Sequence, residues 1–478
     1  MISRSARIIL LACLGLISPA AGVRSSSDQP PAPDPRFGIV ETYVNPAAAS
    51  EAGAGYSRII LRWDVIQPAS PVDWKPANVP DPVIAEELAT GREVVAVLIG
   101  TPAWASAQGG HSARDVPDMF YWQAFVRRMA QQYQGRIRHW IIWNEPDVWD
   151  ANHPGSTWTG TEGDYYRLLK AAYLALKDVD PSLQVYIAGL TYYWDWEHGR
   201  RRYLDRLLDI IVADPEAAAH GHCFDGLIYH LYFNPNQTVG VLEETRQALS
   251  KRSITGKEIW INETNAPPSD DSLERPWSKP RFRVSLQEQA AFVIQEFALA
   301  FSSGASRVEV YKLRNTVDHP ESIEPFGLLR ADNSRRPAFA AYQTVTSYLR
   351  DFRAAYRQRS GNVVAVTFDR GDKTTTVLWT TGQKPARARV RAITSEADLV
   401  DEQGRVRKVK PANGAYVVDL PGAICSHQPC MIGGAPRMLV EAGRANGRPA
   451  LGAPAVPAPT QPPGPKANGK LNTTPNLR

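Results

Sequence analysis

Two separate stretches of the sequence each bring a carboxylate to the end of an apolar, strand-like run. The first is Trp-Ile-Ile-Trp-Asn-Glu-Pro at 140–146, and the second is Glu-Ile-Trp-Ile-Asn-Glu-Thr at 258–264. Glu145 and Glu263 would therefore stand at the ends of two strands. Cleavage of a glycosidic bond needs two such groups, because one carboxyl must protonate the leaving oxygen while the other attacks or stabilises the sugar cation. The pair predicts hydrolysis of a glycoside.

The elements that would position these carboxylates alternate between strands and helices. Eight candidate strands, rich in Ile, Val and Leu, lie at 37–41, 57–63, 93–100, 137–144, 184–190, 224–231, 257–263 and 307–313. Apolar residues recur with a helical period between several of them, and Ser285 with Glu288 forms the capping box of one helix. This pattern predicts an α/β fold, a (β/α)8 TIM barrel over 36–350. Catalytic groups of such barrels lie where strands end, as Glu145 and Glu263 do.

After residue 350 the pattern changes to short strands alone. A hairpin is expected from 363–368 and 374–379, and a half-buried strand with a basic outer face at 386–392. We expect a small, sandwich-like all-β domain over 351–443. Residues 444–478 are rich in Pro, Ala and Gly and carry few large apolar side chains, so they are expected to form a disordered tail.

The N-terminus resembles an export signal. Arg4 and Arg7 precede an apolar run, and small residues follow it, which predicts a signal peptide over 1–22 and a Ser- and Pro-rich linker over 23–35. Cys13 lies in a faint match to a lipoprotein box, but apolar residues continue past it, so we expect cleavage rather than a lipid anchor. No other segment has about 18 consecutive apolar residues, so stable membrane insertion is not expected. The predicted location is secreted or periplasmic.

The net charge bears on nucleic-acid binding, and the cysteines bear on disulfide formation. The chain has a formal charge of +5, but 1–22 holds two positive charges and 444–478 holds five, which leaves −2 on the remainder. This balance gives no support to nucleic-acid binding. Cys425 and Cys430 are close enough in sequence for a disulfide in an oxidising compartment. Zinc is the alternative, although two thiols and His427 do not complete a tetrahedral site.

At this point the chain resembles clan A of the glycoside hydrolases, in which Trp-Asn-Glu-Pro ends strand four and a second Glu ends strand seven. It is most similar to family 39 and related bacterial exopolysaccharide hydrolases, a group that includes β-xylosidases. Further segments that resemble the group lie at 52–68, 100–105, 224–232 and 327–338.

The resemblance implies a role for several residues. Glu145 would be the general acid/base and Glu263 the nucleophile. The other residues implied to contact the carboxylates or the sugar are Arg58, Trp104, Asn144, His230, Tyr232 and Tyr311. Arg62 is the alternative to Arg58, since both share one strand face. Many clan members have a Trp at the end of strand eight, where this chain has Tyr311 and Lys312, and either of these would replace it.

Six tryptophans in predicted loops are open to two interpretations: they stack on sugars or they plug the barrel. They are Trp104, Trp149, Trp158, Trp194, Trp196 and Trp277. Asp270 and Asp271 form an acidic loop in which a solvated tip is the favoured interpretation and calcium the alternative.

Together, these patterns and the resemblance imply a secreted, retaining β-glycoside hydrolase that acts on a polysaccharide or oligosaccharide, for example a bacterial exopolysaccharide. It would need no metal or organic cofactor. An exo-acting β-xylosidase is the alternative within the enzyme class, and a non-catalytic carbohydrate-binding barrel is the alternative outside it. The sequence does not determine the oligomeric state.

Overall fold

The computed structural model describes residues 32–274, 277, 280–316, 325–445 and 450–451. The predicted signal peptide lies outside this part of the chain. The same is true of residues 23–31 of the predicted linker and 452–478 of the predicted tail.

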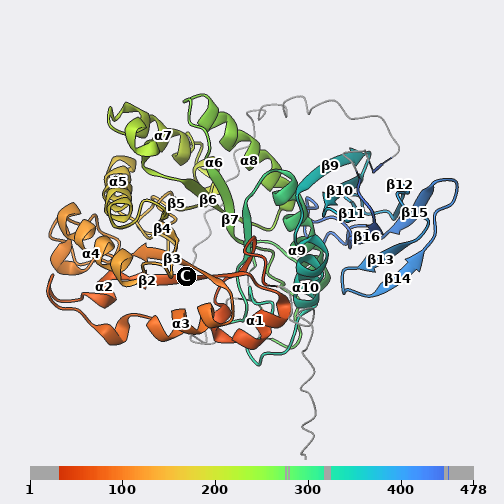
Figure 1. Ribbon diagram of the computed structural model, residues 1–478, viewed down its shortest axis with the longest axis horizontal. Coiled ribbons are helices and arrows are strands. Elements are labelled where there is room, and N and C mark those ends of the chain that lie inside the picture. Colours follow the sequence, from red (N-terminus) through yellow and green to blue (C-terminus); the bar gives the residue numbers. More distant parts are fainter. Residues whose placement is uncertain (1–31, 275–276, 278–279, 317–324, 446–449, 452–478) are drawn as a thin grey trace, which may run out of the picture. The chain divides into compact units, whose positions relative to one another are not determined.

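Eight parallel strands close into a barrel in the order of the sequence, which confirms the predicted fold class (Figure 1). The strands are β1 (Phe37–Ile39), β2 (Tyr56–Arg62), β3 (Glu93–Ile99), β4 (His139–Asn144), β5 (Gln184–Leu190), β6 (Gly226–Tyr232), β7 (Glu258–Asn265) and β8 (Arg307–Val310). The interior of the barrel is filled by buried aromatic and branched side chains, among them Tyr186 and Trp260. It is therefore a packed core, and the open end formed by the strand termini is left for chemistry.

Helices cover the outside of the barrel (Figure 1). They are α1 (Pro46–Ala52), α2 (Trp63–Ile66), α3 (Asp81–Ala89), α4 (Met119–Gln132), α5 (Glu162–Val179), α6 (Tyr193–Glu197), α7 (Tyr203–Ala213), α8 (Pro235–Ser250), α9 (Leu286–Ser302) and α10 (Pro337–Leu349). The capping box predicted for α9 is present: the Ser285 hydroxyl accepts the Glu288 backbone N–H, and the Glu288 carboxylate accepts that of Ser285. Within the described residues, no helix combines the length and apolar character that a membrane span needs.

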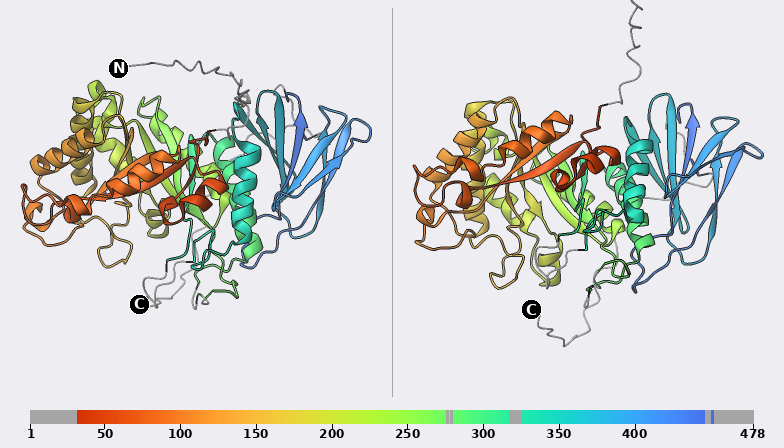
Figure 2. Two further views of the ribbon diagram at one scale, coloured as in Figure 1. Left: turned by 60° about the horizontal axis from the view of Figure 1, so that its bottom comes forward. Right: turned by 90° about the horizontal axis from the view of Figure 1, so that it is seen from below.

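The C-terminal part is an all-β region, as predicted, and its strands are drawn in blue in Figure 2. Its strands are β9 (Ala354–Ser360), β10 (Val363–Asp369), β11 (Lys373–Thr380), β12 (Ala386–Arg391), β13 (Ala397–Asp401), β14 (Val406–Val409), β15 (Ala415–Leu420) and β16 (Arg437–Ala442). Six of them form one antiparallel sheet in the order β14-β13-β16-β11-β10-β9, and β12 pairs with β15. The predicted hairpin corresponds to β10 and β11, and β12 exposes its arginines while burying Ala388 and Val390.

The disulfide interpretation of Cys425 and Cys430 is confirmed. Cys425 and Cys430 form a disulfide in the connection between β15 and β16. Cys223 is buried and forms no disulfide.

Ala450 and Leu451, which fall in the predicted tail, lie against β12, where the Arg391 backbone N–H donates to the Ala450 carbonyl.

Candidate active site

Glu145 is turned into the barrel mouth by the irregular end of β4. Trp143 and Glu145 both have left-handed backbone angles, with φ of 75° and 43°. The Glu145 backbone N–H donates to the Gly189 carbonyl of β5 at 3.0 Å, which holds the residue after the strand has ended. Trp143 is fully buried and packs on Trp158, so the two neighbouring large side chains point to different places. Trp143 packs in the core, whereas the Glu145 carboxyl group lies at the mouth of the barrel.

Glu263 lies across the mouth on β7, between two hydrogen-bond donors. The Arg58 guanidinium, from the interior of β2, pairs with Oε1, and the Tyr232 hydroxyl donates to Oε2 at 2.7 Å. Burial opposes ionisation of Glu263, but the charges of His230 and Arg58 and the Tyr232 hydrogen bond outweigh it. The pKa of Glu263 is therefore below its usual value, and the group is held as a carboxylate.

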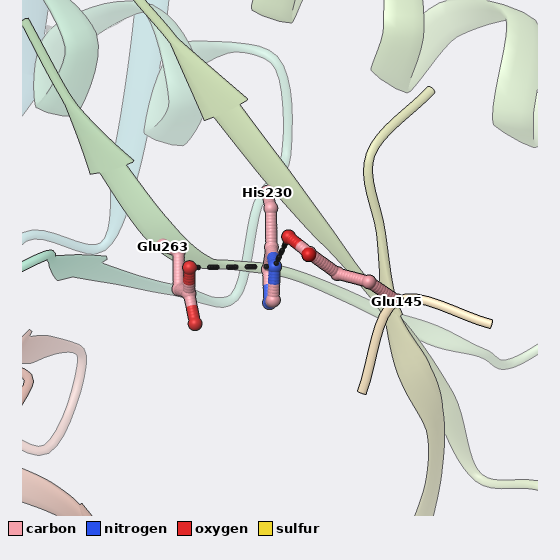
Figure 3. A group of neighbouring side chains, drawn as sticks. All are labelled: Glu145, His230 and Glu263. Carbon is pink, nitrogen blue, oxygen red and sulfur yellow. Dashed lines mark hydrogen bonds and ion pairs between the residues drawn. The ribbon is translucent and has the colours of Figure 1, made fainter. Parts of the chain in front are cut away.

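His230 connects the two acids (Figure 3). Its Nδ1 lies 2.7 Å from Oε1 of Glu145 and 3.4 Å from Oε2 of Glu263. Burial works against a charged imidazole, but Glu263 and Glu145 outweigh it, so the pKa of His230 is raised. Nδ1 therefore faces a carboxyl oxygen of each acid, and the imidazole lies where it can exchange a proton with Glu145. His230 and Glu263 are paired in register on β6 and β7.

Glu145, His230 and Glu263 are also the residues best placed to hold a metal ion, since each offers a ligand atom within 4.8 Å of the other two. The donor set argues against that use. Arg58 already neutralises Glu263, and Nδ1 of His230 already lies within hydrogen-bond distance of Glu145. A cation here would compete with a guanidinium and with an imidazole that the site favours in its charged form. The geometry suits proton transfer and nucleophilic attack better than metal binding.

Glu145, His230 and Tyr232 line a cavity of about 710 Å³, within the usual range for ligand sites. Its wall is formed mainly by aromatic and polar side chains. The wall includes Glu145, His230, Tyr232, Tyr192, Tyr193, Trp196, Phe233, Asn234, Asn236, Trp277, Arg281, Phe282, Phe326 and Met431. Aromatic faces beside a few polar groups are what a sugar ring requires, because it presents C–H faces and a rim of hydroxyls.

Tyr311 and Lys312, the two candidates to replace the Trp of strand eight, have different surroundings. The Tyr311 ring is in edge contact with Tyr232 and Phe326, whereas Lys312 is buried and pairs with Glu41. Tyr311 therefore lies beside the site at the end of β8.

Asn144 ends β4, next to Glu145, and its backbone carbonyl accepts from the Thr157 hydroxyl. Arg62, the alternative to Arg58, is half exposed and pairs with Asp64.

The loop tryptophans lie in different surroundings, and Trp149 packs against Trp194 and His198. Trp196, which is 72% exposed, and Trp277 line the cavity. Trp158 and Trp194 are buried, so they pack rather than stack on a ligand. Trp104 packs against Trp63, and its indole N–H donates to the Gln67 carbonyl. It lies outside the described lining of the cavity, and its predicted contact with sugar remains a prediction.

Asp147 is a residue of this region that the sequence did not single out. Its Oδ2 accepts hydrogen bonds from the backbone N–H groups of Thr191 and Tyr192 and from the Thr191 hydroxyl, at 2.8 to 3.2 Å. It thereby holds the segment after β5, which lines the cavity. Burial, followed by the charge of Glu145, raises the pKa of Asp147 to about 7. Its position two residues after Glu145 was the available signal.

The two aspartates of the acidic loop differ: Asp270 is exposed, as expected of a solvated tip, whereas Asp271 is not. Asp271 is buried and forms ion pairs with Arg330 and Arg336 at 2.9 and 2.8 Å. These ion pairs connect Asp271, in the segment after β7, with two arginines in the segment after β8.

No protein-family model matches the chain, and no curated protein matches it in sequence. Solved structures do share its fold. A family 39 glycoside hydrolase from Bacteroides cellulosilyticus WH2 superposes with a TM-score of 0.63 and 19% identity, over 85% of this chain and 81% of that one. The chain has the fold of the glycoside hydrolases of families 39 and 30.

Two further structures support this statement. A family 39 β-xylosidase from Caulobacter crescentus has a TM-score of 0.56 and 15% identity, over 86% of this chain and 98% of that one. A family 30 endoxylanase from Clostridium papyrosolvens C71 has a TM-score of 0.57 and 15% identity, over 86% and 97%.

Proposed function

We propose that the protein is a retaining β-glycoside hydrolase with Glu263 as nucleophile and Glu145 as general acid/base. The observation that carries this proposal is the short separation of the two carboxylates, which approach within 4.8 Å. Retaining enzymes hold their carboxyls about 5–5.5 Å apart, whereas inverting enzymes leave about 6.5–9.5 Å for a water molecule. The shared fold with glycoside hydrolases agrees with this assignment.

The unequal surroundings of the two acids support the division of roles. Glu263 is held ionised by Arg58, His230 and Tyr232, as a nucleophile must be. Glu145 contacts Nδ1 of His230. The Glu145 side chain is 20% exposed, whereas that of Glu263 is 11% exposed. It therefore lies where a leaving oxygen can reach it.

The reaction then has two steps. In the first, a carboxylate oxygen of Glu263 bonds to the anomeric carbon while the bond to the leaving oxygen breaks, and Glu145 gives that oxygen a proton. In the second, Glu145 takes a proton from water, the water oxygen bonds to the anomeric carbon, and the ester to Glu263 breaks. Each step inverts the configuration at the anomeric carbon, so after two steps the product has the configuration of the substrate.

We infer that the substrate is an oligosaccharide or polysaccharide, since the cavity has room beyond the reacting groups and carries several aromatic faces. An exo-acting β-xylosidase is the second candidate, because the Caulobacter crescentus protein with this fold is a β-xylosidase. The disulfide supports action in an oxidising compartment, in keeping with export. A bacterial exopolysaccharide is one substrate that such an exported enzyme would meet.

The test is release of reducing ends from a panel of β-linked polysaccharides, with Glu263→Gln beside the wild type. Release by the wild type alone is expected, because the variant lacks its nucleophile. Equal release by both proteins contradicts the role of Glu263. Binding of a polysaccharide by both proteins without release favours the carbohydrate-binding alternative.

Glu145→Gln tests the second role with two kinds of substrate. The leaving group of an activated aryl glycoside needs no proton. Glu145→Gln should therefore retain far more activity on such a glycoside than on the natural polysaccharide. Equal loss on both substrates contradicts the assignment of Glu145.

A further inference from the structure

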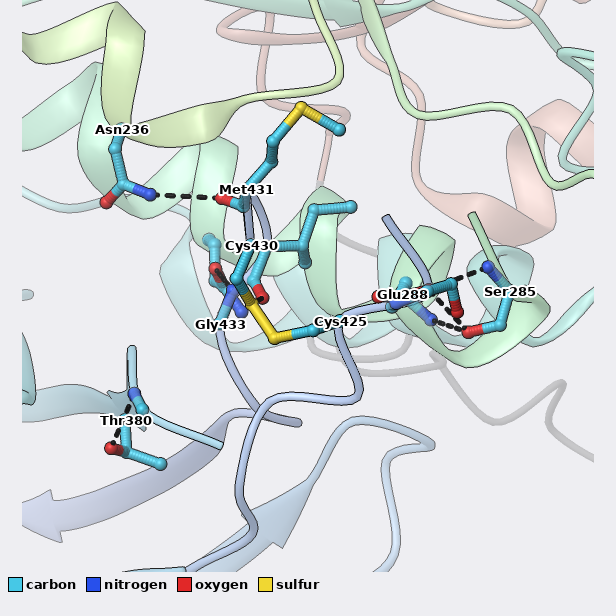
Figure 4. The surroundings of a disulfide bond; sticks show 12 residues. Asn236, Ser285, Glu288, Thr380, Cys425, Cys430, Met431 and Gly433 are labelled. Carbon is cyan, nitrogen blue, oxygen red and sulfur yellow. Dashed lines mark hydrogen bonds between the residues drawn. A yellow bond between two sulfur atoms is a disulfide. The ribbon is translucent and has the colours of Figure 1, made fainter. Parts of the chain in front are cut away.

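A loop of the β domain borders the cavity of the barrel. The connection between β15 and β16 contains residues 425–434, which we term the disulfide loop because Cys425 and Cys430 close it. Met431, the residue after the second cysteine, lies beside Asn236 (Figure 4). It lines the cavity together with residues of β6, α6 and α8. The wall of the candidate active site is therefore drawn from both parts of the fold.

Hydrogen bonds to α9 fix this loop at both ends. The Ser426 backbone N–H donates to Oε1 of Glu288 at 2.9 Å. The Gly433 backbone N–H donates to Oε1 of Gln295 at 3.0 Å, and the Gln295 amide donates to the Gly434 carbonyl at 3.1 Å. Glu288 and Gln295 are buried, so water does not compete for these bonds. The loop is a built part of the wall.

Between the loop and the acids the lining is continuous. The Asn236 amide, at the start of α8, donates to the Met431 carbonyl at 3.1 Å. Phe233 packs on the same apolar cluster as Met431, and it follows Tyr232 in the chain. On the other side, Phe282 lies in edge contact with the His427 ring at 5.0 Å. A sugar chain that leaves the carboxylates along Phe233 would reach Met431.

We propose that the disulfide loop is a substrate-binding wall, and that Met431 contacts a sugar unit beyond the one that reacts. This inference rests on the proposed function, since it concerns the same cavity. A flexible thioether on an aromatic wall suits the apolar face of a sugar ring. The β domain thereby takes part in selecting chains over single sugars.

The charges of the wall indicate which chains fit. Among the described lining residues, Arg281 is the one arginine, and it pairs with Glu197. Glu244, also on the wall, pairs with Arg202 at 2.6 Å. With this arginine already paired, the described lining beyond His230 presents no unpaired guanidinium or ammonium group to an acidic sugar, so the loop side of the cavity suits neutral sugar units.

The test compares two substrates of the same sugar: the polysaccharide that the panel identifies and its 4-nitrophenyl β-monoglycoside. Met431→Ala should lower kcat/KM for the polysaccharide about tenfold relative to the monoglycoside, because the truncated side chain no longer covers the remote unit. The double variant Cys425→Ser/Cys430→Ser should change the ratio in the same direction, since it frees the loop. Ile424→Ala is the matched control, because Ile424 is 55% exposed and lies outside the described lining of the cavity.

Each outcome decides between the two proposals. A wild-type enzyme that cleaves the polysaccharide, with a ratio unchanged in Met431→Ala, overturns the role of the loop and leaves the proposed function standing. A ratio that falls equally in Ile424→Ala also overturns it, because the effect would then be general to the region. A wild type that cleaves no member of the panel removes both proposals together.

Discussion

Glu296 offers a quantitative test of the electrostatics of this fold. It lies on α9 with no exposed surface, and both carboxyl oxygens lie within hydrogen-bond distance of the Thr238 hydroxyl, at 2.8 and 3.0 Å. Burial raises its pKa to about 8 from the ordinary 4.5, although the hydrogen bond from Thr238 acts against the rise. The folded protein therefore keeps a proton on Glu296 that the unfolded chain releases near pH 4.5.

This difference makes stability depend on pH. Between pH 4.5 and about 8 the folded state binds one more proton than the unfolded state, so the free energy of unfolding falls as pH rises. Each tenfold change in the protonation equilibrium is worth about 1.4 kcal/mol, so the contribution of this group changes by about 5 kcal/mol across the interval. That is a large share of the ~5–15 kcal/mol that stabilises a typical protein.

Glu296→Gln removes the titration while retaining an oxygen that can accept from Thr238. We expect the variant to lose much less stability than the wild type between pH 5 and pH 9, as measured by denaturant unfolding at each pH. Any fixed packing cost of the amide cancels, because only the difference between the two pH values matters. Glu243→Gln, an exposed position on α8, is the control. Wild-type and Glu296→Gln curves that run parallel over this range would refute the reasoning.

Two more substitutions probe the site itself. Tyr232→Phe removes a hydrogen bond to the Glu263 carboxylate, a bond of the kind worth about 1.5–3 kcal/mol, and the loss raises the pKa of Glu263. The acidic limb of kcat/KM should therefore move to higher pH, and an unmoved limb would contradict the assignment. Gly189→Ala should greatly reduce kcat, because the new Cβ would lie 1.9 Å from Nε2 of His230 and displace the ring. Gly163→Ala is the control, with its nearest neighbour at 3.6 Å, and equal activity loss in both variants would refute the steric argument.

Local patterns were sufficient to predict the barrel strands and the two acids. Each strand is a short apolar run, and the parallel topology places all strand ends at one mouth, so Glu145 and Glu263 meet although they are far apart in the chain. Capping chemistry is similarly local, which is why Ser285 identified the start of α9.

The wall of the cavity was much less predictable. Trp104 and Trp196 are both loop tryptophans, and no nearby residue distinguishes them in the sequence. The first donates to a backbone carbonyl and packs on Trp63, whereas the second is exposed beside the cavity. Their difference is set by long-range packing of the loops. Met431 is a stronger case, since it reaches the cavity only because a loop of a second sheet is bound to α9.

The same dependence on distant neighbours explains how two identical side chains acquire different roles. Glu263 has a guanidinium on one oxygen and a phenol on the other, so a proton placed on it would break favourable contacts with Arg58 and Tyr232. Glu145 has a hydrogen bond to His230, a residue that can itself carry the proton. The His230 imidazole, whose pKa is raised, therefore holds a proton more readily than Glu263, which stays ionised. Since Arg58 and His230 come from different strands, this asymmetry is a property of the closed barrel rather than of either Asn-Glu motif.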